Sequence, residues 1–339
     1  MNGNRYGGFH RSLLIPMLIF SISSCAYYTP TVAKCEHVIL GQTLSLKLHA
    51  RGADTIGRYL CGRLTELEAK LSMAGDDSHV ARINSMSGIG AVCVHDDLYF
   101  LVERSLDLAR ISEGVYNPAA APLYKLWDEY RFSGRSPSRD EVNCALEKVD
   151  YRNVRLYPET KEVFLKNRGM ALDLGEIVDG FIVDFCAEIL MERDFLGTVL
   201  QYGNVSRYIS RIGEENIEQY AYPRLVTPDQ QLILTLKNCE NRALAIIYPQ
   251  ESLILHLLNG YPVKTDLLCV AVIGPDGVTA DALAHVFVAG DIAMGMQLVE
   301  DMPFFEALCV TQNREIFLSR GGREYTASHA PDFRMMNGE

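Results

Sequence analysis

The sequence predicts an α+β fold: a single compact domain of mixed sheets with packed helices. Two observations support this prediction. Helical and strand-like apolar patterns are both present, and they follow one another without the regular alternation that a doubly wound parallel sheet requires. The chain has 339 residues, of which 48% are hydrophobic and 9% are aromatic. This composition is typical of a globular protein that buries a sizeable core.

Apolar spacing predicts the elements of the first half in chain order. A partly alternating strand pattern covers 38–50, and apolar residues at helical spacing predict helices over 55–72 and 97–112. Ser138 and Glu141 have the spacing of a capping box, which indicates that a helix begins there. Two strands around a turn are expected over 153–167.

In the second half a helix is expected after Gly175 and another from about Val278. Short runs rich in β-branched and other apolar residues predict the strands between and after them. These runs are "GTVLQYG", "RYISRIG", "QLILTLKN", "LLCVAVIG" and "ALCVTQ".

The N-terminus has the pattern of an export signal. Arg5, His10 and Arg11 precede the apolar run "LLIPMLIF", and "SISSC" then ends on Cys25. The apolar run is too short to span a bilayer. Residues 1–24 resemble a bacterial lipoprotein signal, which is cleaved so that Cys25 carries lipid and 25–37 form a tether. An ordinary secretory signal is the alternative, and either interpretation predicts an exported protein; the first predicts a membrane-anchored lipoprotein facing the periplasm.

Charge and cysteine content narrow the function. The chain carries 43 acidic and 32 basic residues, a net charge of −11, so a nucleic-acid partner is not expected. Eight cysteines follow Cys25, and no C-x-x-C pair occurs among them. We therefore predict neither a zinc site nor a catalytic thiol. One or two disulfides are compatible with an oxidising compartment, but the sequence leaves their pairing open.

Four stretches resemble, in sequence order, the motifs of the ApbE-type FAD:protein FMN transferase family. They are "LSMAGDDSHVARIN", "GVYNPAAAPLYKLWDEY", "ALDLGEIVDGFIVD" and "NGYPVKTDLLCVAVIGPDGVTADALAHVFVAG". The resemblance implies an ApbE-like, T-fold-related domain over 38–320, followed by a C-terminal tail over 321–339. Several motifs are eroded, so the chain resembles a divergent member.

The resemblance implies a metal-dependent transferase. Enzymes of this family bind FAD as a substrate with a divalent cation, usually Mg²⁺, transfer FMN to a Thr or Ser hydroxyl of an exported client protein, and release AMP. Some relatives instead act as pyrophosphatases that split FAD into FMN and AMP. A catalytically lapsed flavin-binding or interaction lipoprotein is a further alternative, and the sequence does not indicate the oligomeric state.

The motif "ADALAH" places Asp281 and His285 four residues apart, on one face of a helix. The resemblance assigns Asp281 to the metal site and places His285 where the family has Thr. Mg²⁺ prefers oxygen ligands, whereas imidazole suits softer cations such as Mn²⁺. We predict a metal site of Asp281, His285 and Glu176, with Asp281 also as the candidate catalytic group that orients the client hydroxyl. The alternative is an Asp-His pair that only stabilises the helix.

The resemblance also places a set of residues at FAD. They are Leu40, Gly41, Ala74, Val115, Tyr116, Asn117, Asp173 and Asp179. Three departures from the family pattern concern ligand contacts: Ala74 replaces an aromatic residue that stacks on the cofactor, Asn117 replaces an Asp, and Leu253 replaces a His. The sequence therefore predicts a conserved scaffold with altered ligand contacts.

Overall fold

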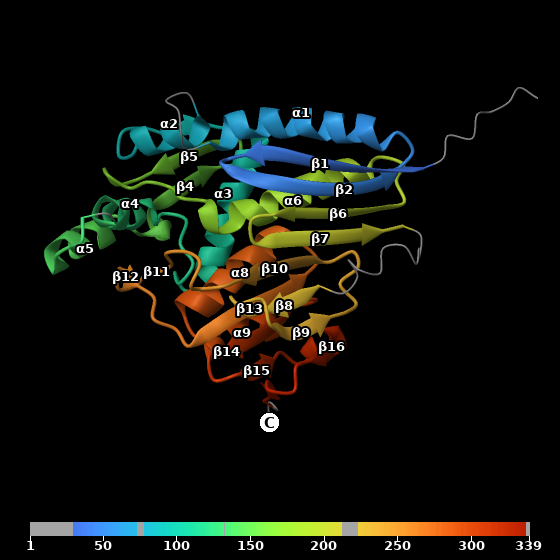
Figure 1. The fold of residues 1–339 in the computed structure, drawn as a ribbon. Helices are drawn as coiled ribbons and strands as arrows, with labels where there is room; N and C mark the ends of the chain where they lie inside the picture. The colour runs from blue at the N-terminus through green and yellow to red at the C-terminus, as the bar shows by residue number, and fades with distance from the viewer. Residues whose placement is uncertain (1–29, 73–77, 132, 212–222, 337–339) are drawn as a thin grey trace, which may run out of the picture.

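The computed structural model describes residues 30–72, 78–131, 133–211 and 223–336. A nine-stranded sheet runs through the domain (Figure 1). Neighbouring strands are antiparallel, except that the last two are parallel. Their spatial order is β1 (Thr31–Ile39), β2 (Gln42–Ala50), β6 (Gly197–Tyr202), β7 (Val205–Ser210), β10 (Ala243–Ile247), β13 (Leu267–Gly274), β14 (Glu306–Thr311), β15 (Glu315–Leu318) and β17 (Arg334–Met335). The predicted α+β class is confirmed.

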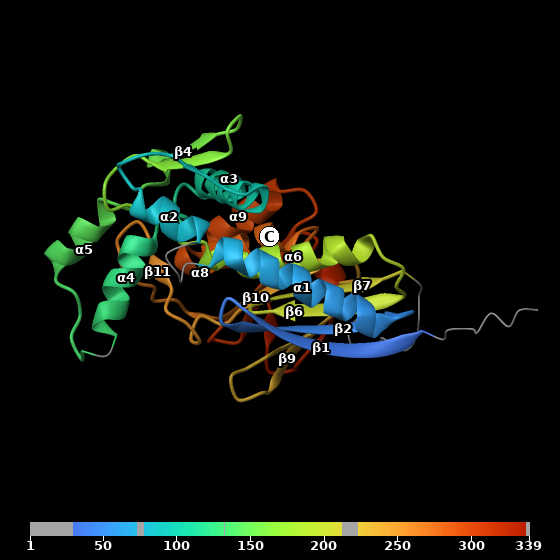
Figure 2. The same ribbon diagram turned by 90° about the horizontal axis from the view of Figure 1, so that it is seen from above.

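A layer of helices packs along this sheet (Figures 1 and 2). Each helix covers the strands nearest to it: α1 lies on β1 and β2, α6 on β6 and β7, α8 on β10 and β13, and α9 on β14. Their bounds are α1 (Ala53–Leu71), α6 (Gly175–Met191), α8 (Gly277–Ala289) and α9 (Ile292–Asp301). The helices predicted after Gly175 and from about Val278 are therefore confirmed.

A three-stranded sheet covers the other face of the C-terminal half. It consists of β16 (Thr326–His329), β9 (Leu232–Leu236) and β8 (Arg224–Val226). Strand β13 lies between the two layers, because Val270 and Val272 belong to the core with α8, whereas Ala271 and Ile273 belong to a second core with β9. A strand covered on both faces is apolar throughout, which explains the run "LLCVAVIG".

Helices α2 (His79–Ser85), α4 (Ala121–Tyr130) and α5 (Arg139–Leu146) and the strand pair β11 (Leu255–His256) and β12 (Tyr261–Pro262) lie toward one end of the domain (Figure 2). Helix α3 (Asp96–Ile111) lies beside α6 and α8, since Phe100 contacts Phe181 and Arg104 donates to Thr279. A small sheet of β3 (Val92–Cys93), β5 (Glu162–Leu165) and β4 (Val154–Tyr157) contacts α2, and the 3-10 helix Tyr151–Asn153 directly precedes β4. The 3-10 helix Gly322–Tyr325 lies against β14 and β16. The capping box predicted at Ser138 and Glu141 is present at the start of α5.

Two predicted boundaries need correction. Strand β1 begins at Thr31, inside the segment assigned to the tether over 25–37, so the domain starts before residue 38. The segment 321–339, assigned to a tail, contributes β16 and β17 to two sheets. Both ends were missed because β1 is a partly exposed edge strand and β17 has only two residues. The predicted signal peptide 1–24 and Cys25 lie outside the described residues, within which no helix is long and apolar enough to cross a membrane.

Helices α6 and α8 cross in direct backbone contact. A Cβ atom at Gly180 would lie 2.1 Å from the Gly277 carbonyl oxygen, and one at Gly277 would lie 2.7 Å from the Gly180 oxygen. Asp184 completes the junction, because its Oδ2 accepts hydrogen bonds from the backbone N–H groups of Gly277 (2.6 Å) and Val278 (3.2 Å). The first turn of α8 is thus capped by a carboxylate of α6.

We expect Gly180→Ala to lower the free energy of unfolding by about 2 kcal/mol or more, because its methyl group would meet backbone atoms that cannot move independently. Gly62→Ala is the matched control: Gly62 lies on the exposed side of α1 with no atom within 4 Å of a Cβ, so alanine should stabilise the chain by up to ~1 kcal/mol. Urea unfolding of both variants measures the difference. Equal stabilities would contradict a close helix crossing.

Candidate active site

Asp281, in the second turn of α8, is fully buried. Its Oδ2 accepts a hydrogen bond from the Gly180 backbone N–H (3.2 Å), whereas its Oδ1 is buried without a hydrogen-bond partner. Burial, followed by the negative charge of Asp179, raises the pKa of Asp281 well above its ordinary value. An unpaired buried carboxylate oxygen is costly, so a cation or a proton donor at Oδ1 would stabilise this arrangement.

His285 lies one helical turn after Asp281. Its Nδ1 is 3.0 Å from the backbone oxygen of Asp281 and 3.7 Å from Oδ1 of the same residue. Because a carbonyl oxygen only accepts hydrogen bonds, this contact assigns the proton of the neutral ring to Nδ1 and leaves a lone pair on Nε2. Burial lowers the pKa of His285, which favours the neutral ring. Neutral imidazole with a free Nε2 is the form that binds cations.

Glu176, in the first turn of α6, accepts a hydrogen bond from the Tyr124 hydroxyl of α4 at 2.5 Å. Burial raises the pKa of Glu176 to about 7, so this carboxyl group exchanges its proton near neutrality. The described residues contain no group of three His, Cys, Asp or Glu side chains placed to hold one metal ion. The predicted set of Asp281, His285 and Glu176 is therefore not assembled in the described residues: Asp281 and His285 are neighbours on α8, while Glu176 pairs with Tyr124.

The loop before α4 is joined to the start of α6. The Asp173 backbone N–H donates to the Pro118 oxygen (2.8 Å), and Asp173 Oδ1 accepts from the Gly175 N–H (2.8 Å). Asn117 is buried and accepts from the Ala119 N–H (3.0 Å), which shapes the turn. Burial raises the pKa of Asp173. The Asn117 side chain thus stabilises the turn of its own loop, and the backbone carbonyl of the next residue, Pro118, positions Asp173.

Tyr116, from the same loop, has a buried hydroxyl group without a hydrogen-bond partner. Burial and the nearby carboxylates, chiefly that of Glu176, raise its pKa. Ser105 beside it donates its own proton to the Leu101 carbonyl (2.7 Å). Val115 is buried in the core rather than exposed to a ligand. Tyr116 Oη and Asp281 Oδ1 are therefore two unsatisfied polar atoms in the same acidic region, a pattern typical of ligand sites.

Asp179 joins three parts of the fold. Its Oδ1 accepts from Gln42 Nε2 (3.0 Å) and its Oδ2 from the Asn204 N–H (3.1 Å). Gly203 is required beside it, because a Cβ there would lie 1.8 Å from Oδ2. Burial raises the pKa of Asp179. Since both oxygens are satisfied by the protein, Asp179 has a structural role here in addition to its predicted place near FAD.

The predicted FAD residues Leu40 and Gly41 form the turn between β1 and β2. Both have positive φ angles, 49° and 80°, and the Leu40 N–H donates to Glu68 Oε1 at 2.7 Å. Gln42 follows directly, so this turn lies beside Asp179 and the start of the site. Ala74, the position of the missing aromatic residue, lies outside the described residues.

Two residues that hydrogen-bond to predicted site residues were not predicted from the sequence. Gln42 contacts a residue 137 positions away and Tyr124 one 52 positions away. Only the position of Gln42 directly after the predicted FAD residues gave a signal, while no local pattern distinguishes Tyr124 from a tyrosine on an exposed helix face.

A cavity of about 480 Å³ lies one helical turn further along α8, at Val288. Its walls combine apolar side chains with Gln250, Lys264 and Asp266, and Leu253 lines it. Val288 is the α8 residue in its wall, and neither Asp281 nor His285 is among the residues that line it. Leu253, which stands where the family has His, is therefore part of a cavity wall.

This fold, with its buried acidic site between two crossing helices, belongs to a known family. The sequence model of the ApbE family matches residues 40–309, and the chain belongs to that family. Two curated relatives are both named FAD:protein FMN transferase. The protein from Treponema pallidum (strain Nichols) is 28% identical over 283 residues, covering 76% of this chain and 77% of the relative. The protein from Klebsiella pneumoniae (strain 342) is 25% identical over 294 residues, covering 83% and 90%.

Solved structures show the same fold. The flavin transferase ApbE from Vibrio cholerae aligns with a TM-score of 0.77 at 18% identity, covering 87% of this chain and 99% of that one. The ApbE protein from Thermotoga maritima aligns with a TM-score of 0.73 at 23% identity, covering 88% and 100%. The predicted family and fold are confirmed, and the named relatives are transferases of the predicted class.

Glu176 should make stability depend on pH. Its carboxyl pKa is about 7 in the folded chain and 4.5 in the reference state, so the folded chain retains a proton that the unfolded chain releases. The resulting stabilisation is complete below pH 4.5 and is lost as the pH rises to 7, on the order of 2 to 3 kcal/mol.

Glu176→Gln keeps an oxygen that accepts from Tyr124 and removes the titration. Urea unfolding of both proteins at several pH values, with chelator and without FAD, should show wild-type stability falling relative to the variant across this interval. Parallel pH profiles would rule out the raised pKa.

Proposed function

We propose that this chain is a divergent, metal-dependent FAD:protein FMN transferase that attaches FMN to a Thr or Ser hydroxyl of an exported client protein and releases AMP. The observation that carries the proposal is the buried Asp281 carboxylate with its unpartnered Oδ1, beside a neutral His285, in a chain of the ApbE family. The names of the curated relatives support the same reaction.

In the proposed reaction, the client hydroxyl oxygen attacks the FMN-side phosphorus of FAD. The bond from that phosphorus to the bridging oxygen breaks, AMP leaves with the bridging oxygen, and the hydroxyl proton passes to a base. Asp281 and His285 would hold a divalent cation, which would supply positive charge to neutralise the phosphoryl oxygens. Mg²⁺ is the cation expected from the family, and Mn²⁺ is the one that His285 favours.

The chain's own residues supply the remaining chemistry. Asp281 is the candidate for orienting the client hydroxyl, since its Oδ1 lacks a partner within the protein. Glu176, with its pKa of about 7, is suited to accept a proton near neutral pH. The unpartnered Tyr116 hydroxyl is available to donate to a phosphoryl oxygen.

The cavity at Val288 of α8 is a candidate space for part of the flavin ligand. Its volume of about 480 Å³ lies in the range of small-molecule sites, and its walls are half apolar and half polar, whereas none of the predicted FAD residues in the described part of the chain lines it. Ala74 provides no stacking partner, so we expect weaker FAD binding than in a relative with an aromatic residue there, by about 1 kcal/mol.

The proposal is tested by titrating FAD into the purified chain with Mg²⁺ or Mn²⁺ and following AMP by chromatography. A detergent extract of membranes serves as the acceptor source. Transfer gives more AMP than free FMN together with covalently flavinylated protein, whereas FAD hydrolysis gives equal amounts of both. Binding without AMP would indicate a lapsed, flavin-binding protein, and no binding would eliminate the proposal.

Variants assign the roles in this assay. Asp281→Asn should reduce AMP release at least ~100-fold, because an amide lacks the carboxylate charge that would hold the cation. Asp107→Asn is the matched control, since the Asp107 side chain is half-exposed and its ion pair in the described part of the chain is with Arg110 of its own helix. In His285→Thr the preference should shift from Mn²⁺ towards Mg²⁺. Unchanged activity in Asp281→Asn would remove that residue from the mechanism.

We further propose that the chain is exported and anchored in the membrane through lipid on Cys25, facing the periplasm. The basic residues, apolar run and cysteine at the N-terminus support this. Cys25→Ser should move the protein from the membrane fraction to the soluble exported fraction, as detected by fractionation and immunoblotting. Retention of the variant in the membrane would contradict lipid anchoring at this cysteine.

A further inference from the structure

Two cysteines from different elements lie in contact. The Sγ atoms of Cys35, on the edge strand β1, and Cys61, on α1, are 3.2 Å apart. They are 26 positions apart in the sequence and both are half-buried. A disulfide bond requires about 2.05 Å between the sulfurs, so small side-chain rotations suffice to close the gap.

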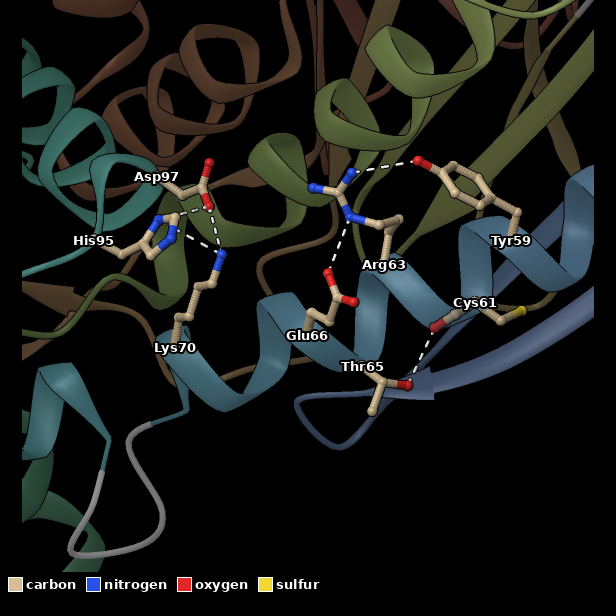
Figure 3. Close-up of polar contacts among 8 residues, drawn as sticks. All are labelled: Tyr59, Cys61, Arg63, Thr65, Glu66, Lys70, His95 and Asp97. Carbon is tan, nitrogen blue, oxygen red and sulfur yellow. Dashed lines mark hydrogen bonds and ion pairs between the residues drawn. The ribbon is translucent and has the colours of Figure 1, made fainter.

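The packing of α1 on β1 permits this approach. Gly57 lies one turn before Cys61 on the same face of the helix, and a Cβ at Gly57 would be 3.9 Å from the Cβ of Cys35. The absence of a side chain at Gly57 therefore lets the strand lie close to the helix at Cys35. Figure 3 shows the Tyr59–Arg63–Glu66 polar contacts on one side of α1 and Cys61 with Thr65 on another, so those ionic contacts leave the Cys61 sulfur unobstructed.

The other cysteines differ from this pair. Cys186 lies near Cys61, but it is fully buried. Cys239, Cys269 and Cys309 are also buried, while Cys93 and Cys144 are exposed. In the described part of the chain, Cys35 and Cys61 are the two cysteines whose sulfur atoms are in direct contact. The structure thus selects one pairing among those that the sequence leaves open.

We propose that Cys35 and Cys61 form a disulfide bond that fastens the first strand of the sheet to α1. The oxidant is a disulfide of another thiol, RSSR. One cysteine thiolate attacks it, releasing RSH and forming a mixed disulfide; the second thiolate then displaces the remaining RS group. Two protons and two electrons pass from the cysteine pair to RSSR, which becomes two RSH. The proposal is independent of the flavin chemistry.

The position of β1 gives this bond a mechanical purpose. Strand β1 is at the edge of the large sheet, where its only strand neighbour is β2. It also starts only six positions after Cys25, so a pull on a lipid anchor there would reach β1 first. A covalent link to α1 passes that force to a helix whose buried face belongs to the main core. It also closes a loop and restricts the unfolded chain.

The test uses the purified full-length chain treated with oxidised glutathione at pH 8.5, alkylated and digested with trypsin without reduction. Cys35 lies in peptide 35–47 and Cys61 in peptide 59–63, so mass spectrometry should find these two peptides linked, with the loss of two hydrogens. The link should disappear in Cys35→Ser and persist in Cys93→Ser, the control at an exposed thiol.

Thermal stability supplies a second measurement. The oxidised wild-type chain should have a Tm roughly 5 °C above that of the reduced chain, and Cys35→Ser should lose this difference. The proposal is overturned if peptides 35–47 and 59–63 are recovered separately alkylated while Cys93 and Cys144 carry glutathione. A link between Cys61 and Cys186 would overturn it as well.

Discussion

The backbone contact between α6 and α8 at Gly180 and Gly277 is the constraint on which the candidate site depends. Because no side chain separates the helices there, the Gly180 N–H reaches the Asp281 carboxylate, and Asp184 reaches the first N–H groups of α8. Both helices also pack on neighbouring strands of the large sheet, so the core holds the crossing in place. The free energy of burying Asp281 with a single donor is offset by that core rather than by local contacts.

The polar residues around this crossing differ in whether their side-chain oxygen atoms have hydrogen-bond partners. Asp179 accepts from Gln42 and from Asn204, so each of its oxygens has a partner and it stabilises the junction of three elements. Asp281 Oδ1 and the Tyr116 hydroxyl have none. A protein that needed only stability would fill these positions with apolar side chains or pair them. These two atoms are consistent with the ligand contacts proposed above, whereas Asp179 holds the surrounding elements together.

The sequence predicted what depends on local pattern and missed what depends on distant contacts. Three features can be predicted because residues close together in the sequence produce them. They are the helical spacing of apolar residues in α1, the capping box of α5 and the continuous apolar run of β13. The sequence predicts a tether over the part of β1 before residue 38, because the exposed face of this edge strand gives it a polar pattern. At the site, the order of the motifs points to Asp281 and His285. The hydrogen bond between Tyr124 and Glu176 joins residues 52 positions apart, and no local sequence pattern predicts such a contact.

Asp281 and His285 are neighbours on one face of α8, and the hydrogen bond between them bears on the cation site proposed above. In the family pattern a threonine occupies the position of His285, and a threonine hydroxyl in a helix can also bond to the carbonyl one turn before it. His285 preserves that contact through Nδ1 and the Asp281 oxygen. A histidine ligand of a metal typically donates its other ring nitrogen to a carbonyl, which fixes the tautomer and the ring orientation. The hydrogen bond that stabilises the helix therefore leaves the lone pair of Nε2 free, so this helical contact is compatible with the metal site proposed above.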